Sequence, residues 1–542
     1  MVRLTSREKN RMKKRADNPS IDPKRYALIA VSAVALIVFL FVVNRVFYLR
    51  MGAFGCFDEC PNYAVGYFLN QGRRLYSDIF FNHQMLLPYI SFLLQKIVTP
   101  LSIYDIVRMH RVFVIAFSLA MDGLLILRFG VPAFGFVALY EATKYYAHGQ
   151  AFLGESLVVY PLVYLLGIAW KSVRNVRVHP YDLIASAVAA WFVVFTREPY
   201  VPVALVLYLT VVWYARRQRY IRSSIGVFII LSAVLLSTVQ LKAFIENVIS
   251  VNLAVLLPQE TRTLGLTGWG IAKPFIYPLL LIFTGGGWNI HRIVQALLSF
   301  AFLVFLVPIA LRTPLRALFL LVVLGLAGLR MVPPGTIYYE AFHMLPWYAL
   351  LIMATSLLAR DLWYRVKERK MLFPFVGFLA VIFFVALGPK SFLWERIDTR
   401  SEFATGYARY SLYSEAIRSL STPHDTLFLE LWDDILYPST GLTPSYRYAW
   451  YIPVMIHDPV FVSERARMFQ VAAPDFYYYS CEEHEPDPPL PQYVRSEYVH
   501  MLHNGKPSCL LIHQRKISTV SEEQLKAAEK LGFTLPKSKS VL

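Results

Sequence analysis

A series of long apolar runs separated by short basic segments is the feature that most constrains this chain. The clearest run, YALIAVSAVALIVFLFVVNRVFY, occupies residues 26–48. A membrane-spanning helix needs about 20 mostly apolar residues, because the hydrocarbon core of a bilayer is about 30 Å thick. The run is too long for the core of a secretory signal, and no small-residue cleavage motif follows it. We therefore expect it to be retained as a first span.

Further apolar runs follow, and the hydropathy falls only after residue 388. Charged residues make up 17% of the chain, whereas soluble domains carry about 25%, so composition also favours a membrane protein. With the first run, the predicted spans number eleven and indicate an α-helical polytopic membrane protein. The remaining candidate spans lie near residues 106–128, 131–147, 151–170, 182–196, 199–215, 224–243, 292–311, 316–332, 343–360 and 371–388.

The basic segments between the spans predict the orientation of the chain. The net charge is +18, and cytoplasmic loops carry an excess of Lys and Arg. Eleven spans place the basic N-terminus (1–25) and all the basic loops on the cytoplasmic side. This count holds only if the short apolar runs 85–98 and 274–283 lie at the interface or re-enter without crossing. Because the excess positive charge lies in these short loops, it is only weak evidence for nucleic-acid binding.

The same count predicts three parts of the chain. A transmembrane domain spans residues 26–388 and carries long outer loops at 49–105 and 244–291. A polar domain of ordinary size follows at 389–542 on the outer side. Three apolar stretches bounded by turn residues, DTLFLEL, DFYYYS and CLLIHQ, predict strands, and GYARYSLYSEAIRSLSTP has helical spacing. We therefore expect an extracytoplasmic α/β domain.

Four cysteines are too few for a disulfide scaffold. Cys56 and Cys60 flank two acidic residues, and Cys481 and Cys509 lie in the polar domain. Both pairs fall on the predicted oxidising side, which is compatible with disulfides, but the sequence does not show the pairing. A lone C-x3-C is a weak zinc signal. No ligand set has diagnostic spacing, so a requirement for a divalent metal ion stays open.

Ionisable side chains near the membrane concentrate on the predicted outer side, where they are costly to place and often functional. Asp58 and Glu59 are adjacent in CFDECPNY, Glu155 opens a span in LGESLVVYP, and Arg197 lies in the TREPY hairpin. The other candidates are Asp78, His83, Arg262 and His343. Each also has an ordinary interpretation, namely a solvated loop face, a weak surface ion pair or an interfacial histidine.

Carboxylates and cations held together in an outer cavity indicate group transfer. A carboxylate can act as general base on an acceptor hydroxyl or amine. Arginine, lysine and histidine can hold a phosphate and stabilise its charge as it leaves. This combination suits the transfer of a sugar from a lipid phosphate whose tail stays in the bilayer.

The first outer loop, DECPNYAVGYFLNQGRRLYSDIFFNHQMLLPYI, resembles that of GT-C fold glycosyltransferases such as protein O-mannosyltransferases and aminoarabinose transferases. The shared pattern is an acidic pair, a helix ending at Gly72, Tyr76-x-Asp78, a basic residue at His83, and Pro88. GESLVVYP and EAFHMLP fit two further elements. Many members have Pro-Pro after the basic residue, whereas QMLLP follows here. No W-W-D-Y-G motif occurs, which disfavours an oligosaccharyltransferase.

The resemblance implies a polyprenyl- or dolichyl-phosphate sugar donor, an inverting transfer, and Asp58 as the catalytic base. Glu59 beside it is interpreted as a catalytic helper or as a residue that starts a helix. In this hypothesis Asp78 and Glu155 orient hydroxyl groups or hold a divalent cation. The donor phosphate would be bound by Arg197, Arg262, His83 and His343.

We therefore expect a glycosyltransferase of the cell envelope, in a bacterial inner membrane with its active site outside. Its acceptor would be a lipid, a glycan or a protein. The main alternative is a transporter or lipid flippase, which predicts acidic residues and helix breaks in mid-span. A non-enzymatic assembly or export component is a third interpretation.

Overall fold

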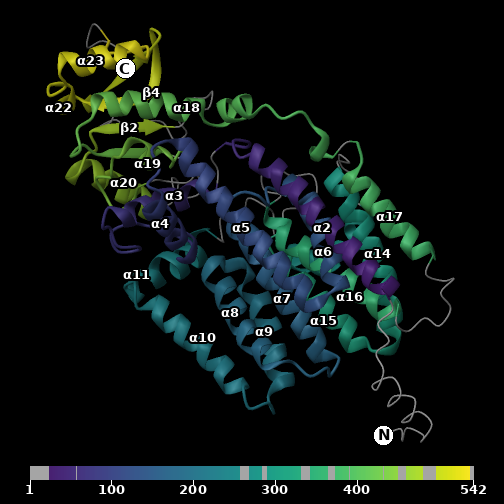
Figure 1. Ribbon diagram of the computed structural model, residues 1–542. Helices are drawn as coiled ribbons and strands as arrows, with labels where there is room; N and C mark the ends of the chain where they lie inside the picture. The colour runs from purple at the N-terminus through teal and green to yellow at the C-terminus, as the bar shows by residue number, and fades with distance from the viewer. Residues whose placement is uncertain are drawn as a thin grey trace, which may run out of the picture. The chain divides into compact units, whose positions relative to one another are not determined.

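A computed structural model of the chain divides into two units, residues 1–46 and 47–542 (Figure 1). The residues that the structure describes are 23–55, 58–256, 268–283, 290–330, 342–363, 373–389, 391–430, 433–449, 459–479 and 496–536.

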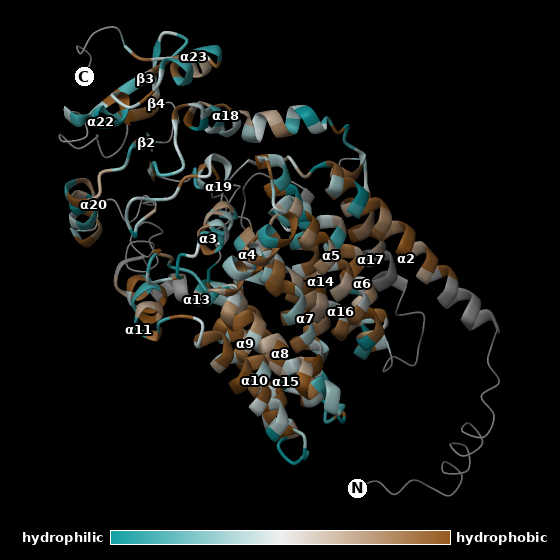
Figure 2. Cartoon of the chain, turned by 60° about the vertical axis from the view of Figure 1, so that its left-hand side comes forward, coloured by the Kyte–Doolittle hydropathy of each residue, from teal (hydrophilic) through white to brown (hydrophobic). Residues whose placement is uncertain are grey.

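Every predicted span has a helix at its position. Figure 2 shows that most of these helices are strongly hydrophobic. Within the described ranges, five helices are long and apolar enough to cross a membrane, or six if one bent pair counts as a single span. Several others are apolar but shorter, so eleven spans remain a prediction. The helices are α2 (Pro23–Leu49), α5 (Ile103–Phe129), α6 (Val131–Thr143), α7 (Gly154–Val173), α8 (Pro180–Thr196), α9 (Val201–Ala215), α10 (Ile221–Leu236), α14 (Ile290–Arg312), α15 (Pro314–Ala327), α16 (Leu345–Trp363) and α17 (Phe373–Leu387).

The region expected as one span at 224–243 and an outer loop at 244–291 differs from that expectation. Helix α10 ends at Leu236, and the chain turns by 97° into a second helical stretch, Leu241–Ala254. Two asparagines hold this stretch against the first outer loop. The amide of Asn247 accepts from the backbone of Phe81 (3.2 Å), and that of Asn252 donates to the carbonyl of Asn82 (2.7 Å). The elements of the region are α11 (Leu241–Phe244), the π-helical η3 (Ile245–Ser250) and η4 (Asn252–Leu256), and α13 (Gly268–Phe283).

Helix α7 lies at the centre of the bundle and is almost completely buried. It packs against α5, α8, α9 and α16 (Figure 1). Close packing depends on Gly167, because a Cβ there would lie 2.4 Å from ring atoms of Phe129. Such contact on all sides holds the first residues of α7, including Glu155, in a defined position.

Two helices lie in residues 49–105, the segment predicted as the first outer loop. Helix α3 (Cys60–Asn70) begins directly after the acidic pair, and α4 (Leu86–Val98) matches the short apolar run expected at the interface. The two helices pack closely at Gly66, where a Cβ would lie 2.4 Å from the hydroxyl oxygen of Ser91. Helix α4 exposes Leu93 and Ile97, as an interfacial helix would.

The C-terminal part has the expected α/β character. Its sheet has the order β1-β2-β4-β3-β5, in which β1 and β2 are parallel and the other neighbours are antiparallel. The three predicted strands are β1, β2 and β4; the half-exposed β3 and the two-residue β5 lacked a strong apolar signal. The elements are α18 (Thr399–Leu420), β1 (Leu427–Glu430), α19 (Leu436–Thr440), α20 (Pro459–Val471), β2 (Phe476–Tyr479), β3 (Tyr498–His503), β4 (Lys506–His513), α22 (Gln514–Ile517), α23 (Glu522–Lys530) and β5 (Phe533–Thr534).

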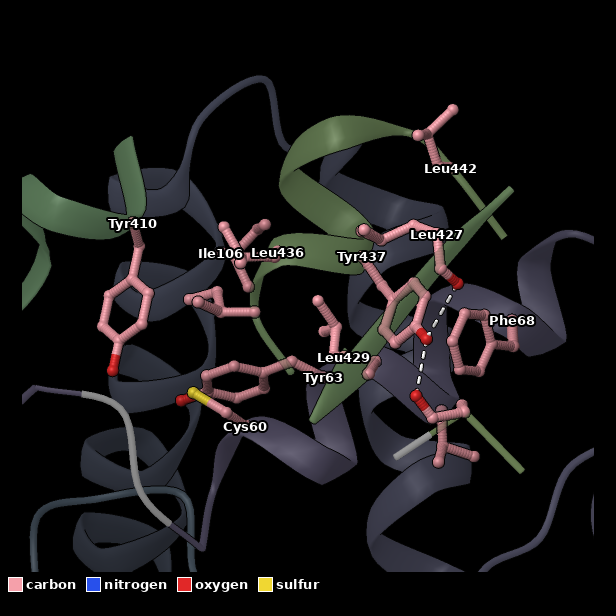
Figure 3. Close-up of a cluster of buried hydrophobic side chains, with 14 of the residues drawn as sticks. Cys60, Tyr63, Phe68, Ile106, Tyr410, Leu427, Leu429, Leu436, Tyr437 and Leu442 are labelled. Carbon is pink, nitrogen blue, oxygen red and sulfur yellow. Dashed lines mark hydrogen bonds between the residues drawn. The ribbon is translucent and has the colours of Figure 1, made fainter. Parts of the chain in front are cut away.

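One hydrophobic core joins this domain to the first outer loop. Figure 3 shows side chains of α3 meeting those of β1 and α19. The rings of Phe68 and Tyr437 meet edge to face at 4.9 Å, and the Tyr437 hydroxyl donates to the carbonyls of Leu427 (3.2 Å) and Ala449 (2.5 Å). The C-terminal domain is therefore packed directly behind the loop that carries Asp58.

Helix α18 holds the same loop from its other end. The Tyr407 hydroxyl donates to the carbonyl of Gly55 (2.9 Å). Gly406 allows this approach, because a Cβ there would lie 2.8 Å from the Gly55 nitrogen. The backbone immediately before the acidic pair is thus anchored to the C-terminal domain.

Candidate functional site

Arg197 lies at the centre of a polar cluster between the ends of several helices. Helix α8 ends at Thr196, Arg197 is extended, and the short helix η2 (Glu198–Tyr200) leads into α9. The arginine side chain runs across the start of α7. Gly154 makes room for it, because a Cβ at that position would lie 3.0 Å from the Arg197 Cδ.

Three predicted site residues surround this guanidinium. Its Nε donates to Oε1 of Glu155 at 2.9 Å. Its Nη1 donates to Nδ1 of His83 at 3.0 Å, and its Nη2 lies 3.7 Å from Oδ2 of Asp58. Residues from the first outer loop, the start of α7 and the α8–α9 turn therefore meet at one cation.

His343 joins the cluster through Glu155. Its Nδ1 donates to Oε1 of Glu155 (3.0 Å), while its Nε2 accepts from Nε of Arg330 (3.4 Å). The Tyr200 hydroxyl donates to the backbone carbonyl of His343 (2.9 Å). These partners hold the ring in one orientation and add a second guanidinium to the cluster.

The side chains of the cluster differ in burial. Glu155 and Arg197 form a buried floor, and Asp58 and His83 form a partly exposed rim. The Glu155 side chain is 1% exposed and that of Arg197 is 8% exposed. By contrast, Asp58 is 35% and His83 is 32% exposed. The buried ion pair forms a rigid base, and the carboxylate of Asp58 and the ring of His83 remain within reach of a ligand.

Glu198 lies at the same rim. Its Oε1 is 3.4 Å from Nδ1 of His83, the nitrogen that accepts from Arg197. The His83 ring therefore lies between the Arg197 guanidinium and the Glu198 carboxylate. The sequence signal for Glu198 was its place beside Arg197 in TREPY, which by itself also fits an exposed ion pair.

Glu59 lies apart from the cluster, although it follows Asp58 directly. Its side chain is fully buried and ion-paired with Arg111 of α5, and it accepts from the Phe152 backbone amide at 2.9 Å. Burial alone would raise the pKa of Glu59, but these donors, chiefly Arg111, bring it below its usual value. The geometry favours a structural role for Glu59.

Asp78, another predicted site residue, is not brought to Arg197. It pairs with Arg74, four residues earlier in the chain, at 3.0 Å on the protein surface. The hydrogen bond from Arg74 is the main cause of a lowered pKa of Asp78. Arg262 lies outside the residues that the structure describes.

Two of the four cysteines lie in described segments. Cys60 and Cys509 are both disulfide-bonded, whereas Cys56 and Cys481 fall outside those segments. As for metals, the described residues contain no group of three or more His, Cys, Asp or Glu side chains that could hold an ion.

Asp434 of the C-terminal domain is a neighbour of the cluster that the sequence did not indicate. Its side chain is buried, and its Oδ1 has no hydrogen-bond partner among the described residues. Burial and the carboxylates of Asp433 and Asp58 raise the pKa of Asp434 well above its usual value. The only local signal was a pair of acids inside the apolar stretch LWDDILY.

Asp434→Asn is expected to stabilise the protein at pH 8 and to have a smaller effect toward pH 4. Because the pKa of Asp434 is raised in the folded state, wild-type Asp434 makes its full contribution to the free energy of unfolding below its unfolded-state pKa. That contribution is lost as the pH rises through the raised folded-state value. Asparagine stays neutral throughout. Thermal unfolding in detergent at several pH values measures the difference.

Asp433→Asn is the matched control, because the neighbouring carboxylate pairs with Arg409 at 3.4 Å. Its loss should destabilise the protein at pH 8. Equal effects of the two substitutions at all pH values would contradict the prediction for Asp434.

Comparison with known proteins identifies the fold. No family model and no curated protein sequence matches the chain. The structure is similar to that of ArnT from Cupriavidus metallidurans bound to undecaprenyl phosphate, with a TM-score of 0.50 and 10% identity over 88% of this chain and 97% of that chain. For ArnT in the apo state the TM-score is 0.51 at 10% identity, over 90% and 98% of the two chains.

A weaker likeness links the chain to the archaeal oligosaccharyltransferase AglB from Archaeoglobus fulgidus, solved with an inhibitory peptide and a dolichol-phosphate. Its TM-score is 0.46 at 12% identity, over 89% of this chain and 75% of that chain. The likeness to ArnT, an aminoarabinose transferase, confirms the predicted GT-C fold. At 10% identity it identifies the fold, and the chemistry has to be argued from the residues of this chain.

Proposed function

We propose that the protein is an integral membrane glycosyltransferase that moves a sugar from a polyprenyl-phosphate donor to an acceptor, with Asp58 as general base. The observation that carries the proposal is the partly exposed Asp58 carboxylate beside the buried Arg197–Glu155 pair. The shared fold supports a lipid-phosphate donor, because ArnT was solved with undecaprenyl phosphate bound.

In the proposed reaction, Asp58 takes the proton of an acceptor hydroxyl or amine. The acceptor atom attacks the anomeric carbon of the sugar, and the bond between that carbon and the phosphate oxygen breaks. The electron pair leaves with the lipid phosphate, and attack opposite the leaving group inverts the anomeric centre. Arg330, His83 and Arg197 are the nearby donors for the charge that develops on the phosphate.

Glu155 and His343 act through Arg197 and Arg330 in this scheme. The Glu155 carboxylate accepts hydrogen bonds from both Arg197 and His343, so it fixes the two donors relative to each other. A rigid, water-poor arrangement of this kind stabilises transition-state charge better than mobile groups do. Glu155 is therefore assigned a positioning role, in contrast to Asp58.

Two observations support a site on the extracytoplasmic side. Cys60, two residues after Asp58, is disulfide-bonded, as is Cys509 of the C-terminal domain, and disulfides persist mainly in oxidising compartments. The basic segments 171–177 and 215–222 follow the ends of α7 and α9 that point away from Arg197. The positive-inside rule makes those ends cytoplasmic, which fits a bacterial inner membrane.

A transfer assay tests the function directly. The purified protein is placed in liposomes with polyprenyl-phosphate donors that carry a labelled sugar, and lipid, glycan and peptide acceptors are supplied in separate reactions. The expected result is a labelled acceptor and one free polyprenyl phosphate released per sugar transferred. Movement of intact labelled donor between leaflets, without a new glycosidic bond, would instead support the flippase alternative.

A further inference from the structure

A pocket lies at the far ends of the helices that carry the Arg197 cluster. It has a volume of about 710 Å³ and is formed by the α7–α8 and α9–α10 turns. Helix α8 has 17 residues between the two places, so they are separated by about 25 Å. The polar side chains that line the pocket include Asn175, Arg177, Tyr214, Arg217, Arg219 and Tyr220.

The pocket carries positive charge that the described part of the protein does not balance. Arg177, Arg217 and Arg219 line it together with no acidic side chain, and no ion pair of theirs occurs among the described residues. The acids at this end are engaged elsewhere. Asp182 pairs with Arg128, and Asp361 pairs with Arg174 at 2.6 Å.

The shape of the arginines suits a phosphate group. Guanidinium groups bind phosphate oxygens in a bidentate fork, and they remain charged at all physiological pH values. Arg219 is already ordered, because its guanidinium lies 4.5 Å from the centre of the Tyr220 ring and donates to the Tyr220 hydroxyl at 2.6 Å. Less side-chain entropy is then lost when an anion binds.

Apolar surface adjoins the charged pocket. Trp213, Tyr214 and Tyr181 are exposed at this end of the bundle, and Trp and Tyr are enriched where membrane proteins meet the lipid–water interface. Leu209, one turn of α9 away from Trp213, is exposed as well. A ligand that combines a phosphate with acyl chains can contact both the arginine-lined pocket and the apolar surface beside it. A soluble phosphate can contact only the pocket.

We propose that this pocket binds the phosphodiester headgroup of an anionic phospholipid, with Arg177, Arg217 and Arg219 as its ligands. Basic pockets between transmembrane helices are suited to such headgroups. The site is separate from the Arg197 cluster, and the proposal does not depend on the glycosyltransferase reaction. Bound lipid would stabilise the α7–α8 and α9–α10 turns from the other end of the helices.

Lipid binding is tested by native mass spectrometry and thermal unfolding of the full-length protein in detergent. Added phosphatidylglycerol or cardiolipin should bind and raise the melting temperature more than phosphatidylcholine does. In the triple variant Arg177→Gln/Arg217→Gln/Arg219→Gln, affinity should fall by about 100-fold, because the charge-assisted hydrogen bonds from three guanidinium groups to the phosphodiester are lost.

The matched control removes the same charge outside the pocket lining, as Arg216→Gln/Arg222→Gln/Arg312→Gln. It should retain most of the lipid effect. Equal losses in the two triple variants would show a general charge effect and overturn the proposal. So would a stabilisation by inorganic phosphate as large as that by anionic lipid, because the site would then recognise the free anion.

Discussion

Asp58→Asn is expected to lower the rate of sugar transfer by about 10²- to 10⁴-fold, the usual contribution of a general base. The amide cannot take the acceptor proton, yet it has nearly the same size as the carboxylate. The donor site should persist, because the hydrogen bonds among Arg197, Glu155 and His343 do not pass through Asp58. Initial rates in liposomes should therefore show a large fall in kcat with a small change in KM for the donor.

Asp78→Asn is the control for this experiment. It removes a carboxylate of the same type from the same loop, but at a surface ion pair with Arg74, and its rate should stay within about twofold of wild type because such pairs contribute little. A folded Asp58→Asn protein that transfers sugar at the wild-type rate would show that Asp58 is not the base. The overall assignment as a glycosyltransferase is tested separately by the wild-type assay.

Glu59→Gln, one residue further on, is expected to act on stability. Removing one partner of a buried ion pair typically costs about 3–5 kcal/mol, because the other charge stays buried without compensation. Here Arg111 would keep its charge inside the protein, although it also donates to the carbonyls of Met51 (2.7 Å) and Ala53 (2.6 Å). The melting temperature in detergent should fall sharply.

The double variant Glu59→Gln/Arg111→Met separates charge burial from simple loss of contacts. Replacing both charges by groups of similar volume should recover part of the lost stability. Protein that remains folded at low temperature should retain the Asp58-dependent reaction. If Glu59→Gln left the melting temperature unchanged and removed activity, Glu59 would belong to the reaction centre with Asp58.

Much of the fold follows from local sequence patterns. Each apolar run predicted as a span has a helix at its position, because the hydrophobic length of a segment is a local property of the sequence. The strands DTLFLEL, DFYYYS and CLLIHQ were predicted for the same reason. The bend after Leu236 was not predicted. The stretch after it is held by hydrogen bonds between the side chains of Asn247 and Asn252 and the backbone of the distant first loop.

The sequence alone placed ionisable residues at one end of the predicted spans, and Asp58, His83, Glu155, Arg197 and His343 do meet there. The expectation that ionisable residues near a membrane are functional led to these five residues, but it also included Glu59 and Asp78, which pair with Arg111 and Arg74 away from Arg197. Which acid remains partly exposed beside Arg197 was decided only by the tertiary structure. The reason is that burial and ion pairing arise between segments far apart in the chain. Glu59 is buried in an ion pair with Arg111, and α18 and α19 pack against the loop that carries both acids. Asp58 is left partly exposed beside Arg197.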